Sequence, residues 1–479
     1  MFRKYMMIIL AILMLAASGC NAQEDSQTAD KEIRGAWLHG WVHGYLSPQE
    51  VDETIAAAKK AGINALYIQV RKNGDAYYKS AIVPRATNIV GADFDPLEYA
   101  IQKAHAQGMQ VHAWVNAFRV WSRAAYPSDP NHIVNAHPDW LTKDSKGSVL
   151  ASEGVYLDPG APGVRDYMAK VVMEIVKNYD VDGVQWDYIR YPGQNFGYAD
   201  TALERFYAET KTTARPDPKD ETWSQWRRDQ VTELVKLVYR QVKAVKPDIA
   251  ISASTIAWGS ASQDFKKTEN YWAVYQDWAA WAADGILDAN LPMVYKYDNN
   301  PKGAASFRGW LEGFNRWHGG KPTYVGVEVH SDDLPGAINQ ILATRKAGLE
   351  GFVLFDFRPG KTRDKLVDMM ATQLKAARAP AASTAPKPMA KQADIKEART
   401  AYARGIELAV ANKIDEAIVQ FKKAGELDPT YTEAYFRLGR CYLKKENYPE
   451  AKTAFQRTLE LSPSYEPARK ELQLLDKQK

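Results

Sequence analysis

From residue 33 onward, short apolar runs rich in β-branched and aromatic residues alternate with stretches of helical periodicity. Several helical stretches, such as SPQEVDETIAAAKKAG, end in glycine, which commonly terminates a helix. Strands followed in turn by helices predict an α/β fold, a (β/α)8 TIM barrel. A doubly wound open sheet is the alternative, but no glycine-rich nucleotide loop follows the first strand. The predicted strands span residues 34–40, 63–70, 109–118, 181–189, 248–255, 289–297, 322–329 and 349–357.

The pattern changes after residue 378, where the predicted barrel domain (32–378) ends. Residues 379–393 are rich in Ala and Pro and predict a linker. Residues 394–479 then repeat with a period of 34 residues, which predicts an all-α domain of two tetratricopeptide repeats plus a closing helix. Within it, Cys441 is expected to be an inert core thiol. The matching positions are Gly405, Ala417, Phe421, Leu427, Pro429 and Tyr431 with Gly439, Ala451, Phe455, Leu461, Pro463 and Tyr465.

The first residues have the pattern of a bacterial export signal. Arg3 and Lys4 precede an apolar stretch that is too short to span a bilayer comfortably. The following Ala-Ser-Gly-Cys resembles a lipobox, so residues 1–20 are a predicted lipoprotein signal peptide and Cys20 the lipidation site; a plain secretory signal is the alternative. Residues 21–31 are polar and predict a flexible tether. We therefore expect a lipid-anchored protein of the bacterial cell envelope, on the periplasmic or outer-surface side.

Composition excludes several classes of function. Lys plus Arg total 62 against 58 for Asp plus Glu, a formal net charge of +4 with no basic run, which argues against a dedicated nucleic-acid binder. Two cysteines are too few for a disulfide framework or a cysteine-rich zinc site. Neither HExxH nor HxH nor GxSxG occurs, so the sequence predicts no metal centre, no cofactor and no serine nucleophile elbow.

Strand alternation predicts which side chains point into the barrel, because successive residues of a strand face opposite sides. Where apolar residues occupy one side of a strand, that side should meet the helices. On this rule Val184, Trp186, Val325, Val327, Val353 and Phe355 face outward. The predicted inward-facing residues are Trp37, His39, Gln69, Arg71, His112, Trp114, Asn116, Gln185, Asp187, Ser252, Ser254, Glu328 and Asp356. Those expected to contact the substrate are Trp37, His39, Gln69, Arg71, His112, Trp114, Asn116, Gln185 and Asp356.

The polar inward residues gather near the C-terminal ends of their strands, where barrel enzymes carry their chemistry. An unpaired carboxylate inside a packed barrel would cost several kcal/mol, so a solvated pocket is expected at this end. A structural network in which the carboxylates pair with Arg71, Arg190 or Arg358 is the alternative. Aromatic residues follow several strands and suit stacking on sugar rings; they are Trp41, Trp121, Trp258, Tyr295 and Tyr297.

Region 32–375 resembles the bacterial glycosyl hydrolase-like family 10. The resemblance rests on RGAWLHG, QVRKNGDAYYKSAIVP, VHAWVNAFR, HPDWL, YLDPGAPGVRDY and DGVQWDYIRYP, and more loosely on LPMVY and GFVLFDFR. It implies a TIM-barrel glycosidase that acts on bacterial envelope or extracellular glycans, including glycans that contain amino sugars. It also implies that the pocket contains Gln69, Arg71, Asp75, Asn116, Arg119, Asp158, Asp187, Arg190 and Tyr295.

Glycoside hydrolysis generally uses two carboxyl groups. Asp187, at the end of the fourth strand, is the first candidate and Glu328, at the end of the seventh, is the second; Asp356 and Asp75 are the reserves. Arg190 should keep Asp187 ionised, which favours Asp187 as nucleophile and Glu328 as acid, although the roles could be exchanged.

The leading hypothesis is a lipid-anchored glycoside hydrolase with a poly- or oligosaccharide substrate and repeats that recruit a protein partner. A non-catalytic glycan-binding lipoprotein and a scaffold in which only the repeats act are the alternatives.

Overall fold

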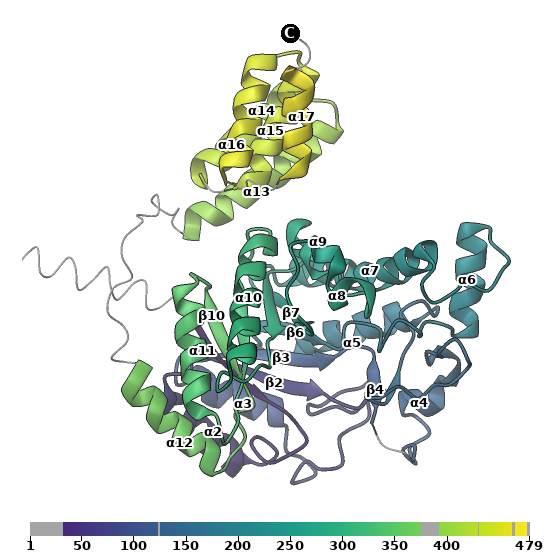
Figure 1. The fold of residues 1–479 in the computed structure, drawn as a ribbon, viewed down its shortest axis with the longest axis vertical. Helices are drawn as coiled ribbons and strands as arrows, with labels where there is room; N and C mark the ends of the chain where they lie inside the picture. Colours follow the sequence, from purple (N-terminus) through teal and green to yellow (C-terminus); the bar gives the residue numbers. More distant parts are fainter. Residues whose placement is uncertain (1–31, 123–124, 375–391, 430, 462–464, 477–479) are drawn as a thin grey trace, which may run out of the picture. The chain divides into compact units, whose positions relative to one another are not determined.

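The computed structural model describes residues 32–122, 125–374, 392–429, 431–461 and 465–476 (Figure 1). By its contacts the chain divides into two compact units, Met1–Ala379 and Pro380–Lys479. The predicted signal peptide with Cys20, the tether, most of the linker and Pro463 lie outside the described residues.

The first unit is a closed barrel of eight parallel strands, as the sequence predicts. The strands pair in chain order, and the last one closes the barrel by pairing with the first. They are β1 (Ile33–Leu38), β2 (Ala65–Arg71), β3 (Gln110–Asn116), β6 (Gly183–Asp187), β7 (Ala250–Ile256), β8 (Ala289–Met293), β9 (Tyr324–Glu328) and β10 (Gly351–Phe355). A short antiparallel pair, β4 (Arg119–Trp121) and β5 (Val155–Tyr156), lies between β3 and β6 in the chain and was not predicted.

Helices surround the strands in this unit (Figure 1). The first of them shows why they form where they do: Ser47 caps its N-terminus, Pro48 opens it, and Gly62 ends it with a left-handed φ of 73°. The helices are α2 (Pro48–Ala61), α3 (Pro96–His105), α4 (Ile133–Ala136), α5 (Val164–Asn178), α6 (Asp200–Thr210), α7 (Glu221–Val245), α8 (Glu269–Trp272), α9 (Trp278–Ala283), α10 (Pro301–Trp317), α11 (Leu334–Lys346) and α12 (Lys361–Met369). Short helical turns also occur at Pro138–Trp140, Phe265–Lys267 and Met370–Leu374.

The barrel interior is a packed layer of side chains, separate from the apolar core between strands and helices. Trp37 lies at its centre and contacts the rings of Tyr67 and Phe355, each with a centroid separation of 6.2 Å. Val353 and Phe355 therefore face inward, and the prediction that they face the helices was wrong. The reason is that β10 is apolar on both sides, so alternation alone cannot orient it. On β6 and β9 the outward prediction is confirmed for Val184, Trp186, Val325 and Val327.

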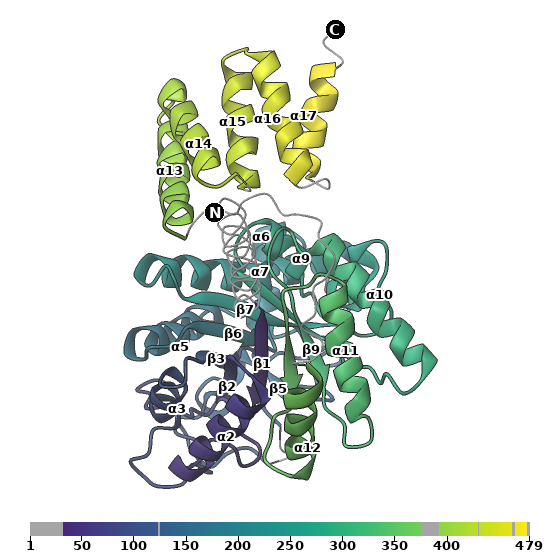
Figure 2. The same cartoon turned by 90° about the vertical axis from the view of Figure 1, so that its left-hand side faces the viewer.

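The second unit is a row of helices, each packed on the next (Figure 2). They are α13 (Gln392–Val410), α14 (Ile414–Leu427), α15 (Thr432–Lys444), α16 (Tyr448–Leu461) and α17 (Glu466–Asp476). Gly405 lies against the ring of Phe421, and Gly439 lies in the same way against Phe455, so the sequence repeat is also a repeat of contacts. The Cys441 thiol is buried, and burial raises its pKa, in keeping with a core position.

Candidate active site

Asp187 ends β6 and is almost fully buried, with 4 % of its surface exposed. Both of its carboxylate oxygens accept hydrogen bonds, from the backbone N–H of Tyr188 at 2.7 Å and from the indole N–H of Trp114 at 3.0 Å. Tyr188 has a left-handed φ of 49°, which turns the chain directly after the strand. Burial raises the pKa of Asp187 to about 6, although the charge of Arg190 and both N–H donors lower it. Arg190 thus favours the carboxylate, as expected from the sequence, but desolvation has the larger effect on the pKa of Asp187.

The charges of three carboxylates act on one tyrosine, Tyr295, which follows β8. Burial raises the pKa of the Tyr295 hydroxyl well above its usual value, and the charges of Asp187, Glu328 and Asp356 raise it further. These carboxylates follow three different strands, β6, β9 and β10. Asp187 lies on the inward side of β6, because its neighbour Trp186 packs against the helices and its carboxylate accepts from Trp114 of β3. On β9 the helix-facing residue is Val327, so alternation places Glu328 inward.

Asp356 is held as an anion by two donors. The Nε2 atom of His39 lies 2.8 Å from Asp356 Oδ2, and the Nε atom of Arg358 lies 3.3 Å from Oδ1. His39 Nδ1 accepts the backbone N–H of Trp41 at 3.3 Å, so in the neutral imidazole the proton is on Nε2 and points at Asp356. Burial raises the pKa of Asp356, but His39 and Arg358 more than offset this and hold it below the usual value.

Glu328 has a different environment. Its side chain is 28 % exposed, and its Oε2 lies 2.8 Å from His330 Nε2, at an angle unsuited to a hydrogen bond. The other ring nitrogen of His330 lies 3.1 Å from the hydroxyl of Tyr297, and the two rings stack with a centroid separation of 4.0 Å. Glu328 is thus the most accessible of the three carboxylates.

Cations alternate with aromatic rings along one side of this end of the barrel. Lys72 and Arg119 lie over Trp41, at 4.4 and 5.6 Å from the ring centroid. The guanidinium groups of Arg119 and Arg190 lie 5.0 and 4.8 Å from the ring of Tyr188. Arg190 also lies 5.3 Å from Trp258. Trp41 and Trp258 at the two ends are 41 % and 39 % exposed, so each offers an open ring surface.

Several predicted contact residues lie deeper, inside the barrel. The Trp37 indole donates to Gln185 Oε1 at 2.9 Å, and Gln185 in turn donates to Ser254 Oγ. His112 stacks on Tyr67 at 4.5 Å, near the start of β3, and burial lowers its pKa to about 4. Trp37, His112 and Gln185 therefore face inward as predicted, but they pack inside the barrel beneath the carboxylates and do not line the site.

Arg71 and Asp158 are not at the site, and both predictions are corrected. A register shift after Gln69 pairs Arg71 with Val115, which faces the helices, and the guanidinium donates to the Asn116 and Ala117 carbonyls. Asp158 is fully buried. Its oxygens accept hydrogen bonds from two hydroxyl groups and two backbone N–H groups, those of Thr142, Tyr191, Gly160 and Ala199. A carboxylate bound by four donors within the protein has a structural role.

The remaining predicted residues lie at the upper ends of β2 and β3. Gln69 accepts the N–H of Gly40 at 3.1 Å and donates to Asn116 at 3.2 Å, while Asn116 donates to the carbonyl of Lys72 at 2.8 Å. Asp75 is partly exposed and accepts the N–H of Asn73 at 2.7 Å. These contacts order the loops after the strands.

Sequence reasoning missed Glu153, which lies between β4 and β5. Its carboxylate accepts from Arg190 at 3.1 Å and from the Tyr156 hydroxyl at 3.0 Å. Burial raises the pKa of Glu153, but Arg190 and Tyr156 hold it below its usual value. Because Glu153 lies in a loop, strand alternation could not place it; the pairing of two very short strands carries it to the site.

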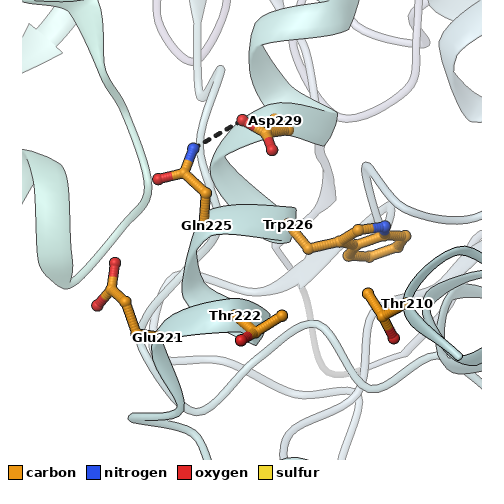
Figure 3. Close-up of a pocket in the computed structure, with 6 residues that line it drawn as sticks. All are labelled: Thr210, Glu221, Thr222, Gln225, Trp226 and Asp229. Atoms are coloured by element: carbon orange, nitrogen blue, oxygen red, sulfur yellow. Dashed lines mark hydrogen bonds between the residues drawn. The ribbon is translucent and has the colours of Figure 1, made fainter. Parts of the chain in front are cut away.

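A separate groove of about 460 Å3 lies between α6 and α7 (Figure 3). In it Gln225 donates to Asp229 at 2.7 Å. None of the predicted site residues lines this groove, so it is distinct from the carboxylate site. Its lining residues are Thr210, Glu221, Thr222, Gln225, Trp226 and Asp229.

Over the described ranges, no group of three or more His, Cys, Asp or Glu side chains is arranged to hold a metal ion. Within the same part of the chain, no helix combines the length and the apolar character needed to cross a bilayer.

Two protein families match this sequence, one over the barrel and one over the repeats. The model of the Glycosyl hydrolase-like 10 family matches residues 32–309, more than half of the sequence. The chain belongs to the glycosyl hydrolase-like 10 family. The family match includes β6 with Asp187 and ends before β9 and β10, which carry Glu328 and Asp356. A tetratricopeptide repeat model matches residues 408–475, which confirms the predicted repeats.

Two relatives of this glycosyl hydrolase-like 10 protein are themselves named glycosyl hydrolases. Glycosyl hydrolase YngK of Bacillus subtilis is 30 % identical over 295 residues, which cover 56 % of this chain and 54 % of the relative. Glycosyl hydrolase DigH of Escherichia coli K12 is 28 % identical over 319 residues, covering 58 % of this chain and 69 % of the relative. The match thus spans about half the length of YngK. Family and relatives together support a glycoside hydrolase-like function.

Solved structures share the barrel fold. Alpha-L-fucosidase isoenzyme 2 from Paenibacillus thiaminolyticus aligns with a TM-score of 0.52 at 15 % identity, over 72 % of this chain and 49 % of that chain. The catalytic domain of beta-amylase from Paenibacillus polymyxa aligns with a TM-score of 0.52 at 11 % identity, over 73 % of this chain and 99 % of that chain. At these identities the likeness concerns the fold alone.

Proposed function

We propose that this protein is a glycoside hydrolase that cleaves a bacterial envelope or extracellular polysaccharide with a carboxylate pair, Asp187 and Glu328. The observation that carries the proposal is that Asp187 and Glu328 are the last residues of β6 and β9, so that both carboxylates lie at the C-terminal end of the same closed barrel. Glycosidases of this type need one carboxyl group to protonate the leaving oxygen and another to attack the sugar or activate water.

Within the pair, Asp187 is the nucleophile or base. With a pKa of about 6 it is mostly ionised at neutral pH, and its two N–H donors bind the carboxylate form. Asp356 is a poor proton donor because His39 and Arg358 hold it as an anion. This leaves Glu328, which is partly exposed and lies beside His330, as the carboxyl group that protonates the leaving oxygen. The anomeric configuration of the first product, read by NMR, distinguishes retention from inversion.

The substrate class follows from the rings around the carboxylates. Exposed Trp41 and Trp258 suit stacking on the apolar faces of sugars, and the polar groups between them suit sugar hydroxyl and amide substituents. The names of YngK and DigH agree with hydrolysis of glycosidic bonds. We include amino-sugar glycans of the envelope among the expected substrates.

Two further parts of the proposal concern location and partner. The leader and Cys20 support a lipid anchor in the bacterial envelope, with the barrel on the periplasmic or outer-surface side. Tetratricopeptide repeats commonly present a surface to other proteins, so the second unit is proposed to recruit a protein partner.

The test is hydrolysis by the full chain. Purified protein is incubated with isolated bacterial envelope glycans, and new reducing ends are counted, with Asp187→Asn as the matched control. Reducing ends that appear with wild type and not with the variant support the proposal. Glycan affinity without turnover in wild type would instead identify the non-catalytic binding protein.

A further inference from the structure

Glu153 is held in place by a tight turn, in which the backbone N–H and carbonyl groups of Ala151 and Gly154 bond to each other. The next residue is Gly154, where φ is 120° and a Cβ atom would lie 2.0 Å from the carbonyl oxygen of Trp121, so only glycine closes this turn. The backbone carbonyl of Glu153 accepts from Arg119 Nε at 2.7 Å. The carboxylate accepts from the Tyr156 hydroxyl at 3.0 Å and from the Tyr188 hydroxyl at 3.4 Å. The side chain therefore has a fixed position although it is 36 % exposed.

Arg190 depends on Glu153 for its hydrogen bonding. Its side chain is only 3 % exposed and is packed between the rings of Tyr188 and Trp258. Among the described residues, Nη2 donates to Glu153 at 3.1 Å, while Nε and Nη1 have no partner. A buried guanidinium with a single anchor takes its orientation from that anchor.

The same guanidinium also acts on Asp187. Its positive charge favours the Asp187 carboxylate, whereas the negative charge of Glu153 opposes it. The other groups that act on Asp187 are the indole N–H of Trp114 and the backbone N–H of Tyr188, which both donate to it, and the hydroxyls of Tyr188 and Tyr295. The charges of Glu328 and Asp356 also act on Tyr295, and Arg119 lies against the ring of Tyr188. Glu153 differs from these groups because it both binds Arg190 and disfavours the Asp187 carboxylate through its own charge.

We propose that Glu153 is a positioning residue. It fixes the orientation of the Arg190 guanidinium, and its negative charge partly offsets the effect of the positive charge of Arg190 on Asp187. Through Arg190 it controls how readily the catalytic carboxylate ionises, without itself contacting the reacting atoms. This inference rests on the proposed function only in so far as Asp187 is the carboxylate that reacts.

The test is a titration of Asp187 in the full chain. Protein labelled with 13C at aspartate carboxyls is titrated by NMR, and the Asp187 signal is assigned by its loss in Asp187→Asn. Glu153→Gln keeps an oxygen that can accept from Arg190 but removes the charge, so Asp187 should titrate about 1 pH unit lower. Arg190→Gln should move the titration upward by a similar amount. Glu204→Gln, which removes an exposed carboxylate of α6, is the control and should leave it unchanged.

An Asp187 titration that stays in place or moves upward in Glu153→Gln overturns the proposal. Where Glu153→Gln fails to fold, Arg190→Gln decides: an unmoved titration in that variant also overturns it. The pH profile of kcat/KM on a hydrolysed glycan gives a second readout, because its acidic limb should follow the titration. Since the titration needs no turnover, absence of hydrolysis by wild type would count against the proposed function and not against this role of Glu153.

Discussion

The indole N–H of Trp114 donates to Oδ2 of Asp187 at 3.0 Å, from β3 to the neighbouring β6. Both side chains are almost fully buried, at 5 % and 4 % exposure. A hydrogen bond to the charged form favours that form, and water cannot replace it at a buried position. Trp114, which the sequence predicted as a substrate contact, is therefore better understood as a support for the Asp187 carboxylate.

Replacing Trp114 with phenylalanine should leave a ring in place and remove the donor. Loss of the donor raises the pKa of Asp187 above about 6, so the ionised fraction near neutral pH falls. We expect kcat/KM at pH 7 to fall roughly tenfold and the acidic limb of its pH profile to move to higher pH. Trp186→Phe is the matched control, because the Trp186 indole faces the helices and its N–H has no hydrogen-bond partner among the described residues. Equal profiles for the two variants would contradict the role of Trp114.

Asp356→Asn should affect substrate binding more than turnover. Asp356 is held as an anion by His39 and Arg358, so we expect it to orient the substrate rather than to donate a proton. We expect KM to rise roughly tenfold, as for the loss of one charged hydrogen bond, with kcat within a few-fold of wild type. Steady-state kinetics decide the matter: a loss of kcat as large as that of Asp187→Asn would make Asp356 the second catalytic carboxyl in place of Glu328.

Gly439→Ala should destabilise the repeat unit. An added Cβ would lie 2.6 Å from the ring of Phe455, and such overpacking costs about 1–3 kcal/mol. All 14 tryptophans lie at or before Trp317, so fluorescence follows barrel unfolding alone, whereas far-UV circular dichroism follows both units. The variant should lower the urea midpoint only in the circular dichroism signal. Gly309→Ala is the control, since an added Cβ on α10 meets nothing within 4 Å. An unchanged urea midpoint of the repeat unit in Gly439→Ala would contradict the prediction, because it would mean that the close contact with Phe455 contributes nothing to stability.

Cys20→Ala should release the protein from membranes, because acylation of that one thiol is the proposed anchor. Fractionation of cells followed by a high-salt wash measures this. Wild type should stay in the membrane pellet, and the variant should be recovered in the soluble fraction. A variant that still pellets would show that another element retains it.

Sequence reasoning predicted the barrel because each strand is a short apolar run closed by turn residues. It placed Asp187 correctly because β6 is apolar on one side only, with Val184 and Trp186 toward the helices. It misplaced Phe355, whose strand is apolar on both sides, and Arg71, which lies beyond a register shift that reverses the alternation. Such shifts depend on how neighbouring strands pair, which is not visible in one strand.

The surroundings of the carboxylates were harder to predict than their positions. Glu153 is brought to Arg190 by the antiparallel pairing of two very short strands that are distant in the chain, and Glu153 and Arg190 are themselves 37 residues apart. The favourable charge of Arg190 could be predicted from its spacing to Asp187 in the sequence. The extent of desolvation, which raises the pKa of Asp187 to about 6, depends on the completed packing and could not.

The central claim is that Asp187 and Glu328 act together, and turnover of one glycan by three variants tests it most directly. Asp187→Asn and Glu328→Gln should each lower kcat by roughly 10² or more, with KM little changed because shape is kept. The double variant should lose little more than the worse single variant, since the two groups act as one unit. Near-normal kcat in Glu328→Gln beside an inactive Asp187→Asn would contradict the account and remove Glu328 from the mechanism.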